Sequence, residues 1–558
     1  MRTVRYAVLL VFLLAASVIL IRTLGRNHER EAPRERLARL VGKAPATIDL
    51  GRLRNASAGD LCQLGEEYLQ VWRVRDATLL FERAVAADST SHDAWLKLIE
   101  CYANPTVDNE RALSRALSRA SATAPSPADT VLVSGLKSLY VDQDYAAAIT
   151  ALSTLVRGKN ASPDAQFHLA VAYYRLGRLD DASRYLDPLL KKDATVGRVA
   201  ELSIKRYAAA GELDRAAREA SELASLYPEE PVPHVLIAQV ELARDNASAA
   251  LESAGHALDL DPHCVPAILT RACLYAQGGD YESARVSYEK LMLFDDPVLA
   301  SVGHEGIAFA DFLAGDFDDG ADSMDEAIRE AMTAGATRRG LALSSRLVDV
   351  LCQLGRADAA EGVVERWITG FGDVPVRLAR ARIQLARGNM DAAADVLARL
   401  SSEKEWVLWS RRLSVDVTEL GALAEIAQER QPQALEQLLR DEKEHAAVGA
   451  GAAERRAFVA GYAAFQSGQA ERAMSAFSDV RRSLYGLDFP YHGDPVLYVQ
   501  SFFYRGEAQL ASGQHDAARE SYATFIRYWG EAAWDLDAIA RARQKLETLG
   551  GAAAPTQG

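Results

Sequence analysis

The stretch from Leu169 to Leu190, LAVAYYRLGRLDDASRYLDPLL, predicts two short amphipathic helices separated by a glycine. Apolar residues recur at helical spacing before Gly177 and again after it. Glycine suits this junction because a residue just past a helix end often takes a positive φ. A small residue, Ala182, follows five positions later, where we expect two helix backbones to approach closely. Such a hairpin cannot bury its apolar face alone and must stack on others.

The same unit returns along the chain. Small residues stand at intervals of 34 at Ala148, Ala182, Ala216, Ala250 and Ala284, after intervals of 35 and 36 from Ala77 and Ala112. A glycine precedes a small residue by five positions in Gly177/Ala182, Gly211/Ala216, Gly279/Ala284, Gly315/Gly320, Gly355/Ala360, Gly388/Ala393, Gly468/Ala473 and Gly513/Ala518. This joint spacing predicts an array of stacked helix pairs with one continuous core. The stretch SATAPSPADT, residues 121–130, predicts a loop within the array.

These residues resemble the tetratricopeptide repeat (TPR) family, whose pattern combines a Leu-Gly pair, a Tyr, a small residue, an aromatic and a Pro. The first copy carries Leu64-Gly65, Tyr68, Ala77, Phe81 and Ala84. The resemblance covers most of residues 58–550. It implies an all-α, right-handed solenoid of about 12 helix pairs whose concave face binds other proteins.

The chain divides by pattern and composition. We expect a transmembrane anchor at 1–24, a basic juxtamembrane linker at 25–57, a TPR array at 58–300, repeats with longer helices at 301–400, a degenerate helical segment at 401–453, C-terminal repeats with a capping helix at 454–550, and a disordered tail at 551–558.

The anchor is predicted from the apolar run Tyr6–Ile21, flanked by Arg2, Arg5 and Arg22. A helix of this length reaches about 24 Å, a little less than the roughly 30 Å of a hydrocarbon core. The alternative is a cleaved signal peptide, since Ala15 and Ala16 supply small residues, although the apolar run continues past them. More arginines follow the span than precede it, which favours a solenoid in the cytoplasm. A very short N-terminal tail usually stays inside, however, which would place the solenoid on the opposite side. The five scattered cysteines favour the cytoplasm.

Charge is distributed unevenly. Residues 1–54 contain eleven Lys or Arg and four Asp or Glu, whereas the whole chain has a net charge of −14. The basic end suits anionic headgroups, or is a solvated linker. The acidic remainder argues against nucleic-acid binding, because phosphate contacts need clustered Lys and Arg.

The C-terminal run that ends in RQKLETLG, over about the last 70 residues, resembles helical-repeat regions attached to bacterial serine/threonine kinases and related signalling proteins. The kinase motifs are absent from the sequence: it has no Gly-rich loop and no H-R-D or D-F-G run. The likeness implies a bacterial signalling or assembly context.

No motif for catalysis or metal binding was found. His304-Glu305 lacks the second histidine of H-E-x-x-H, because Ala308 stands in its place. The acidic run from Asp316 to Asp322 has Gly315 and Phe317 where a calcium loop needs carboxylates, so we expect a helix start there. We interpret His256, His263, Cys264 and Cys273 as structural residues. We therefore expect no enzyme activity, no cofactor, no metal and no small-molecule substrate.

The candidate binding residues lie on the first helix of successive pairs, on the side that the family register turns toward the concave face: Phe167, Val171, Tyr174, Arg175, Glu201, Lys205, Val235, Gln239, Leu269, Thr270 and Gln277. The line is apolar with polar groups interleaved, which suits an extended or helical segment of a partner protein. An alternative is that Phe167 and Val171 complete the core. A further candidate is the aromatic group Tyr485, Phe489, Tyr491, Tyr498, Phe502 and Phe503. The sequence thus predicts a membrane-tethered scaffold or adaptor, or alternatively a regulatory accessory of a signalling enzyme or an exported assembly chaperone.

Overall fold

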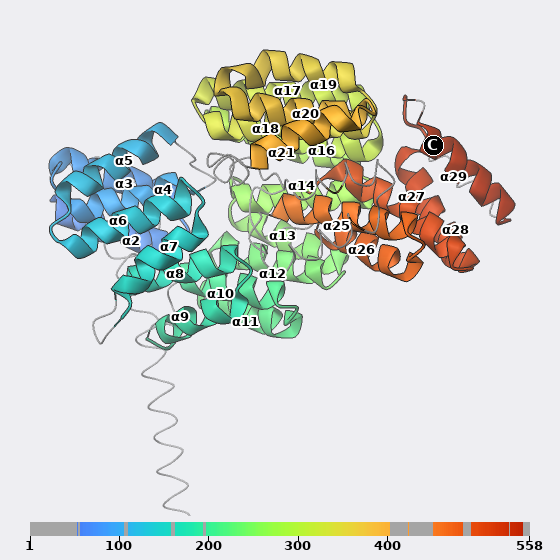
Figure 1. The fold of residues 1–558 in the computed structure, drawn as a ribbon. Helices are drawn as coiled ribbons and strands as arrows, with labels where there is room; N and C mark the ends of the chain where they lie inside the picture. Colours follow the sequence, from blue (N-terminus) through green and yellow to red (C-terminus); the bar gives the residue numbers. More distant parts are fainter. Residues whose placement is uncertain are drawn as a thin grey trace, which may run out of the picture.

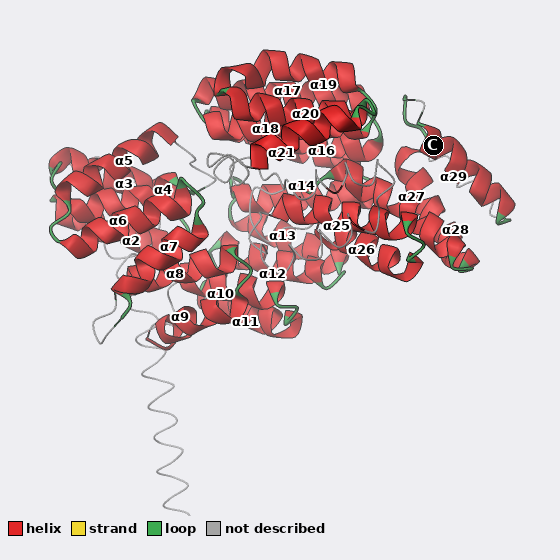
Figure 2. Ribbon diagram, in the orientation of Figure 1, coloured by secondary structure: helices red, strands yellow, loops and turns green. Residues whose placement is uncertain are grey.

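The structure is a computed structural model that describes residues 56–104, 110–157, 162–192, 197–401, 450–483, 493–534 and 536–550, together with Leu53, Ala422 and Gln433. Every regular element in these ranges is helical (Figure 2). The predicted anchor, the tail at 551–558 and nearly all of the linker at 25–57 and of the segment 401–453 lie outside the described residues. The rest forms a curved stack of helix pairs (Figure 1).

The first seven pairs are α2 (Ala58–Gln70) with α3 (Val74–Ala87), α4 (His92–Tyr102) with α5 (Glu110–Thr123), α6 (Pro127–Tyr140) with α7 (Tyr145–Leu155), α8 (Pro163–Arg175) with α9 (Leu179–Lys192), α10 (Gly197–Ala209) with α11 (Leu213–Leu226), α12 (Pro231–Ala243) with α13 (Ala247–Leu260), and α14 (Val265–Gly278) with α15 (Tyr281–Glu289). A short turn of 3₁₀ helix, η1 (Lys290–Leu293), follows α15.

The later pairs are α16 (Pro297–Ala314) with α17 (Phe317–Ala334), α18 (Thr337–Gln353) with α19 (Ala357–Val363), α20 (Asp373–Ala386) with α21 (Met390–Ser401), α25 (Ala450–Gln466) with α26 (Ala470–Ser483), and α27 (Pro495–Ala511) with α28 (His515–Trp529). After α19 come a π-helical turn, η2 (Val364–Ile368), and a 3₁₀ turn, η3 (Thr369–Phe371). The last helix, α29 (Asp537–Thr548), packs on α28 and caps the stack.

The turn inside a pair has the same backbone conformation wherever the structure describes it, which excludes the turn at 105–109 in the second pair. All eight glycines predicted to close a first helix have positive φ, between 69° at Gly177 and 87° at Gly315. Where glycine is absent, the residue at the same place still adopts this conformation: Trp72, Gln143 and Asp245 have φ of 61°, 50° and 62°. The geometry of the hairpin therefore demands the left-handed conformation, and glycine is the residue that takes it without strain.

The predicted small residue lies where the two helices of a pair meet. Ala148, Ala182, Ala216, Ala250 and Ala284 are each the fourth residue of a second helix and are 0% exposed. The prediction is wrong by one position in the second pair: the fourth residue of α5 is Leu113, which is buried, and Ala112 is only half-buried. The predicted loop at 121–130 is also shorter, because α5 runs to Thr123 and α6 begins at Pro127.

The stack curves toward its first helices. Successive first helices pack against one another, as α6 does with α8, α8 with α10 and α10 with α12. Within the described ranges, successive second helices do not pack against one another to the same degree. The first helices therefore form the inner face of the curve. The curvature is strong enough that the start of α18 meets the start of α5, where Arg338 pairs with Glu110. At the far end, α27 and α28 pack back on α16 (Figure 1).

Candidate functional site

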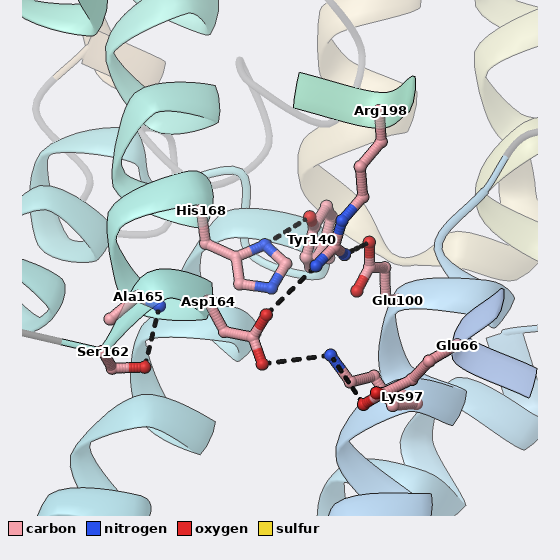
Figure 3. A network of polar contacts seen from close by, with 9 residues as sticks. All are labelled: Glu66, Lys97, Glu100, Tyr140, Ser162, Asp164, Ala165, His168 and Arg198. Carbon is pink, nitrogen blue, oxygen red and sulfur yellow. Dashed lines mark hydrogen bonds and ion pairs between the residues drawn. The ribbon is translucent and has the colours of Figure 1, made fainter. Parts of the chain in front are cut away.

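Charged side chains cross the inner face of the first five pairs (Figure 3). Lys97 of α4 donates through Nζ to Asp164 Oδ2 of α8 at 3.0 Å. Arg198 of α10 donates to Asp164 Oδ1 at 3.0 Å and also to Glu100 of α4. We call Lys97, Glu100, Asp164 and Arg198 the inner network. It joins the second, fourth and fifth pairs through side chains of the chain itself.

Local sequence places the carboxylate of Asp164 at the centre of this network. Pro163 starts α8, and Ser162 caps the helix by accepting a hydrogen bond from the amide of Ala165 at 3.3 Å. Asp164 is thus in the first turn, where the helix dipole favours a negative charge. Arg198 stands in the first turn of α10, so its long side chain reaches back toward α8 and α4.

The four groups of the inner network hold one another in their charged forms. Burial would raise the pKa of Glu100, but the charges around it, of which Arg198 is the strongest, together with the hydrogen bond from Arg198 outweigh burial, and the pKa is lowered. The pKa of Asp164 is likewise lowered, since Lys97 and Arg198 together outweigh its burial. The pKa values of Lys97 and Arg198 are raised for the converse reason. Removing Arg198 would leave Glu100 in a poorly solvated place without its partner, whereas removing Lys97 would leave Asp164 with Arg198.

A neutral histidine lies beside these charges. His168 is 4% exposed, and burial lowers its pKa to about 4 even though Glu100 and Asp164 favour the charged ring. Its Nδ1 is 2.9 Å from the hydroxyl of Tyr140 at the end of α6. Tyr140 thereby ties the third pair to the fourth on the inner face.

The first and fifth pairs also touch. The indole Nε1 of Trp72 donates to Glu201 Oε2 at 2.6 Å, and Glu201 Oε1 accepts from Lys205 at 2.8 Å. Gly197 makes this approach possible, because a side chain there would collide with the carbonyl oxygen of Gln70. Glu201 and Lys205 were predicted as partner contacts, and here they pair with each other while Glu201 also accepts from Trp72.

The structure places the predicted binding residues at different depths. Phe167, Val235, Leu269 and Thr270 are buried; Val171, Tyr174, Glu201, Lys205, Gln239 and Gln277 are half-buried; Arg175 is exposed. Phe167 lies under the Arg198 guanidinium, 4.6 Å from ring centroid to Cζ, and belongs to a small apolar cluster against which Val171 and Tyr174 pack. The alternative reading of Phe167 and Val171 as core residues thus agrees with where they lie. The partner contacts themselves remain a prediction.

The C-terminal pair reaches the far end of the same line. The Tyr528 hydroxyl of α28 donates to the backbone carbonyl of Gln277 at 3.4 Å. Of the aromatic group, Tyr498, Phe502 and Phe503 are buried in the core, whereas Tyr485, Phe489 and Tyr491 lie outside the described residues.

The remaining candidates have structural contacts. His256 meets His234 edge to face at 4.3 Å, and His263 meets Phe294 at 5.8 Å. The acidic run does begin a helix, with Asp316 as the N-cap of α17 and Asp318 accepting from the Trp534 indole at 3.0 Å. No group of three or more His, Cys, Asp or Glu able to hold a metal ion occurs among the described residues.

The inner network was missed from the sequence. Lys97 and Glu100 were visible as charges inside an otherwise apolar helix, HDAWLKLIECY, and that was the available signal. Their partners lie 67 and 98 positions away, in other pairs. Pairings at such separations depend on how tightly the stack curves, which the repeat spacing does not specify.

The fold and the inner face define the class: a helical-repeat solenoid in which the two helices of a pair are joined by a turn containing one residue in the left-handed conformation. Two stretches match tetratricopeptide repeat family models, residues 140–203 and residues 500–532. The first contains α8 and the start of α10, and the second contains α28. The chain therefore contains tetratricopeptide repeats in these two stretches. The resemblance of its tail to kinase-attached regions stays a prediction.

The chain is also similar to several solved structures. It shares 14% identity with yeast Tom70, over 82% of this chain and 96% of that chain, with a TM-score of 0.37. It shares 16% identity with a tetratricopeptide repeat protein from Parabacteroides merdae, over 53% of this chain and 98% of that one, with a TM-score of 0.28. It shares 12% identity with a chain of the Cut9–Hcn1 hetero-tetramer of the APC/C, over 90% of this chain and 98% of that chain, with a TM-score of 0.29. TM-scores and identities this low carry no weight for function. A search of curated proteins finds no match.

None of the described helices is long and apolar enough to cross a bilayer. The apolar run Tyr6–Ile21 is not among them, and its predicted role as an anchor is untouched by this finding.

Proposed function

We propose that this protein is a scaffold that binds a segment of a partner protein on the inner face of its fourth to sixth pairs. The observation that carries the proposal is the arrangement of α8. Its N-terminal turn is held by the inner network, while its last turn presents Tyr174, half-buried, and Arg175, exposed. Tyrosine and arginine are the residue types that contribute most at protein interfaces. A rigid helix that ends in this pair offers an anchor without a large cost in side-chain ordering.

The chemistry of the partner follows from the neighbours of this pair. Val171 and Tyr174 offer a partly apolar surface, and Gln239 on α12 adds a hydrogen-bonding amide. Glu201 and Lys205 already neutralise each other at 2.8 Å, so they add polarity without net charge. Such a surface suits an amphipathic or extended segment with one acidic or carbonyl group for Arg175.

The test is the double variant Tyr174→Ala with Arg175→Ala, scored for partner recovery from native extracts and for thermal stability together. The chain offers a matched control in the same pair, Arg184→Ala with Tyr185→Ala on α9, which removes the same residue types from a second helix. We expect the inner-face variant to lose a partner that the control retains, with both variants stably folded. Equal recovery by the two variants would refute this assignment.

We also propose, from the sequence, that Tyr6–Ile21 attaches the scaffold to a membrane. Removal of residues 1–24 should release the chain from the membrane fraction after alkaline extraction. A full-length chain that is already released by that treatment would contradict the attachment.

A further inference from the structure

The start of α18 lacks a cap of its own. Its N-cap is Ala336, which makes no side-chain hydrogen bond, and alanine is among the poorest residues at this place. The first amides of a helix have no partner within it. Here the carboxylate of Glu110, the first residue of α5, supplies one: the amide of Arg338 donates to Glu110 Oε1 at 2.7 Å. The cap of α18 therefore comes from a helix pair 228 positions earlier in the chain.

The same carboxylate binds the side chains around it. Arg338 Nε donates to Glu110 Oε1 at 2.8 Å, and the Thr337 hydroxyl donates to Oε2 at 2.8 Å. Gly335 lies against the guanidinium of Arg111, where a Cβ would be 3.2 Å from Cζ. We call Glu110, Arg111, Gly335, Thr337 and Arg338 the clasp. It joins the second pair to the turn between the eighth and ninth pairs and closes one turn of the superhelix.

A second contact lies along the same seam. Arg75 of α3 pairs with Asp296, the N-cap of α16, and its guanidinium stands 5.6 Å from the centre of the Phe294 ring. Both contacts are made by partly exposed charged side chains. The side chain of Arg338 is 29% exposed and that of Arg75 is 42% exposed.

The apolar cores do not cross the clasp. The described residues form one large apolar cluster from Leu61 to Val240 and another from Val235 to Leu546. No residue of α5 or α6 belongs to the second cluster, and none of α17 or α18 belongs to the first. Contacts of this polar kind resemble those between domains that move relative to each other, while the apolar stacking within each part does not. The clasp is thus the place where the superhelix opens at the least cost.

The clasp is connected to the inner face through Tyr140. Arg338 Nη1 donates to the backbone carbonyls of Tyr140 at 3.2 Å and of Val141 at 3.3 Å, at the end of α6. The hydroxyl of the same Tyr140 lies 2.9 Å from Nδ1 of His168 on α8. One residue therefore links Arg338 to the helix that presents Tyr174 and Arg175.

We propose that the clasp is a reversible closure that controls access to the inner face of α8. The inference rests on the proposed function, since it concerns regulation of that binding surface. With the clasp formed, the superhelical turn is closed and α6 is fixed beside α8. With the clasp broken, α18 loses the acceptor at its N-terminus, the second pair separates from the eighth and ninth, and Tyr140 is released from Arg338.

Opening is measured as a distance in the full chain. Spin labels are introduced as unnatural amino acids, so the native cysteines remain, at Ser114 on α5 and Thr333 on α17, which are both exposed and outside the clasp. The test variant is Arg338→Ala. The matched control is Arg329→Ala on α17, which removes the same charge but pairs only with Asp325 and Glu326 of its own helix among the described residues.

The expected result at low salt is a single short distance for the unmodified chain and for Arg329→Ala, and a predominant longer distance for Arg338→Ala. Salt at about 1 M, where the screening length falls to about 3 Å, should shift the unmodified chain in the same direction. A short distance retained by Arg338→Ala would overturn the proposal, because the clasp would then not hold the turn closed.

Access to the inner face is measured separately, by hydroxyl-radical labelling of Tyr174 with Tyr185 on α9 as the internal reference. We expect Arg338→Ala to raise the labelling of Tyr174 relative to Tyr185, and Arg329→Ala to leave the ratio unchanged. An unchanged ratio in an opened chain would overturn the claim that the clasp controls access. Neither measurement needs a partner, so a failure here is distinct from a failure of the proposed binding surface.

Discussion

Two parts of this solenoid share one repeat pattern but are held together by different chemistry. On the inner face of α4, α8 and α10, non-adjacent pairs are joined by charges, as Arg198 is to Glu100 and Lys97 is to Asp164. At the other end, α28 is fixed to α16 and α17 by aromatic side chains: Trp529 is 0% exposed, donates from Nε1 to the carbonyl of Phe312 at 3.0 Å, and meets Phe317 edge to face at 5.1 Å.

The difference indicates which contacts are sensitive to salt and pH. Apolar aromatic contacts persist as long as the surfaces stay buried, and they resist salt and pH. Contacts between charged side chains depend on geometry, ionic strength and protonation. We therefore expect the C-terminal end to stay fixed in the stack, and the charged seams of the first superhelical turn to respond to ionic strength, to pH and to the proposed partner.

The largest effect is expected at the aromatic end. Trp529→Ala removes a fully buried indole together with its hydrogen bond to Phe312, which should cost about 3–5 kcal/mol. Hydrogen exchange should show the loss concentrated in α27–α29, with α2–α7 unaffected. The control is Leu293→Ala, since that side chain is 85% exposed. A loss spread evenly over the whole chain would contradict a separate aromatic core.

The next effect concerns pH and the charged end. Because burial lowers the pKa of His168 to about 4 from 6.5, the unfolded chain binds a proton that the folded chain does not bind between these values. Burial of the neutral His168 ring therefore does not lower the free energy of unfolding above pH 6.5. As the pH falls toward 4, the protonation of the unfolded chain lowers that free energy, by about 3 kcal/mol at most.

His168→Gln should therefore flatten the dependence of the urea midpoint on pH in that window. His515→Gln, at the exposed start of α28, is the control and should leave the slope unchanged. A slope that survives His168→Gln in full would mean that the buried ring is not what titrates.

A smaller effect tests the packing common to both parts. Ala216→Trp places a large ring where two helices meet and where Ala216 is 0% exposed, so overpacking should cost roughly 1–3 kcal/mol. Ala209→Trp, at the exposed end of α10, should be nearly neutral. Chemical denaturation followed by circular dichroism compares the two, and equal midpoints would show that the helix register is wrong.

The smallest effect is expected for glycine replacements in the turns, which compare the turn geometry of the two parts. Gly211 and Gly513 have φ of 76° and 73°, and a Cβ at either would meet no atom within 4 Å. Replacement by alanine should cost about 1 kcal/mol at each, from backbone strain alone. Clearly unequal shifts of the denaturation midpoint would show that the two turns differ in surroundings that the backbone does not reveal.

Much of the fold was predictable because its determinants are local. Gly177 and Ala182 act within one hairpin, and their spacing predicted the turn and the close approach that the structure shows. The candidate site was less predictable. That Arg198 covers Phe167, or that Trp72 binds Glu201, depends on small rotations added over several pairs, which the repeat spacing does not encode. Glu110 and Arg338 could not be paired for the same reason, since they meet only after a full turn of the superhelix.

The central claim, that a partner binds on the inner face of α8, is tested most directly by site-specific photo-crosslinking in cells that express the full chain. A photoreactive amino acid is placed at Tyr174 on α8 in one variant, and at Thr150, exposed on the second helix α7, in another. The account predicts a defined crosslinked protein from position 174 that is absent from position 150. A crosslink from position 150 alone, or the same product from both positions, would contradict it.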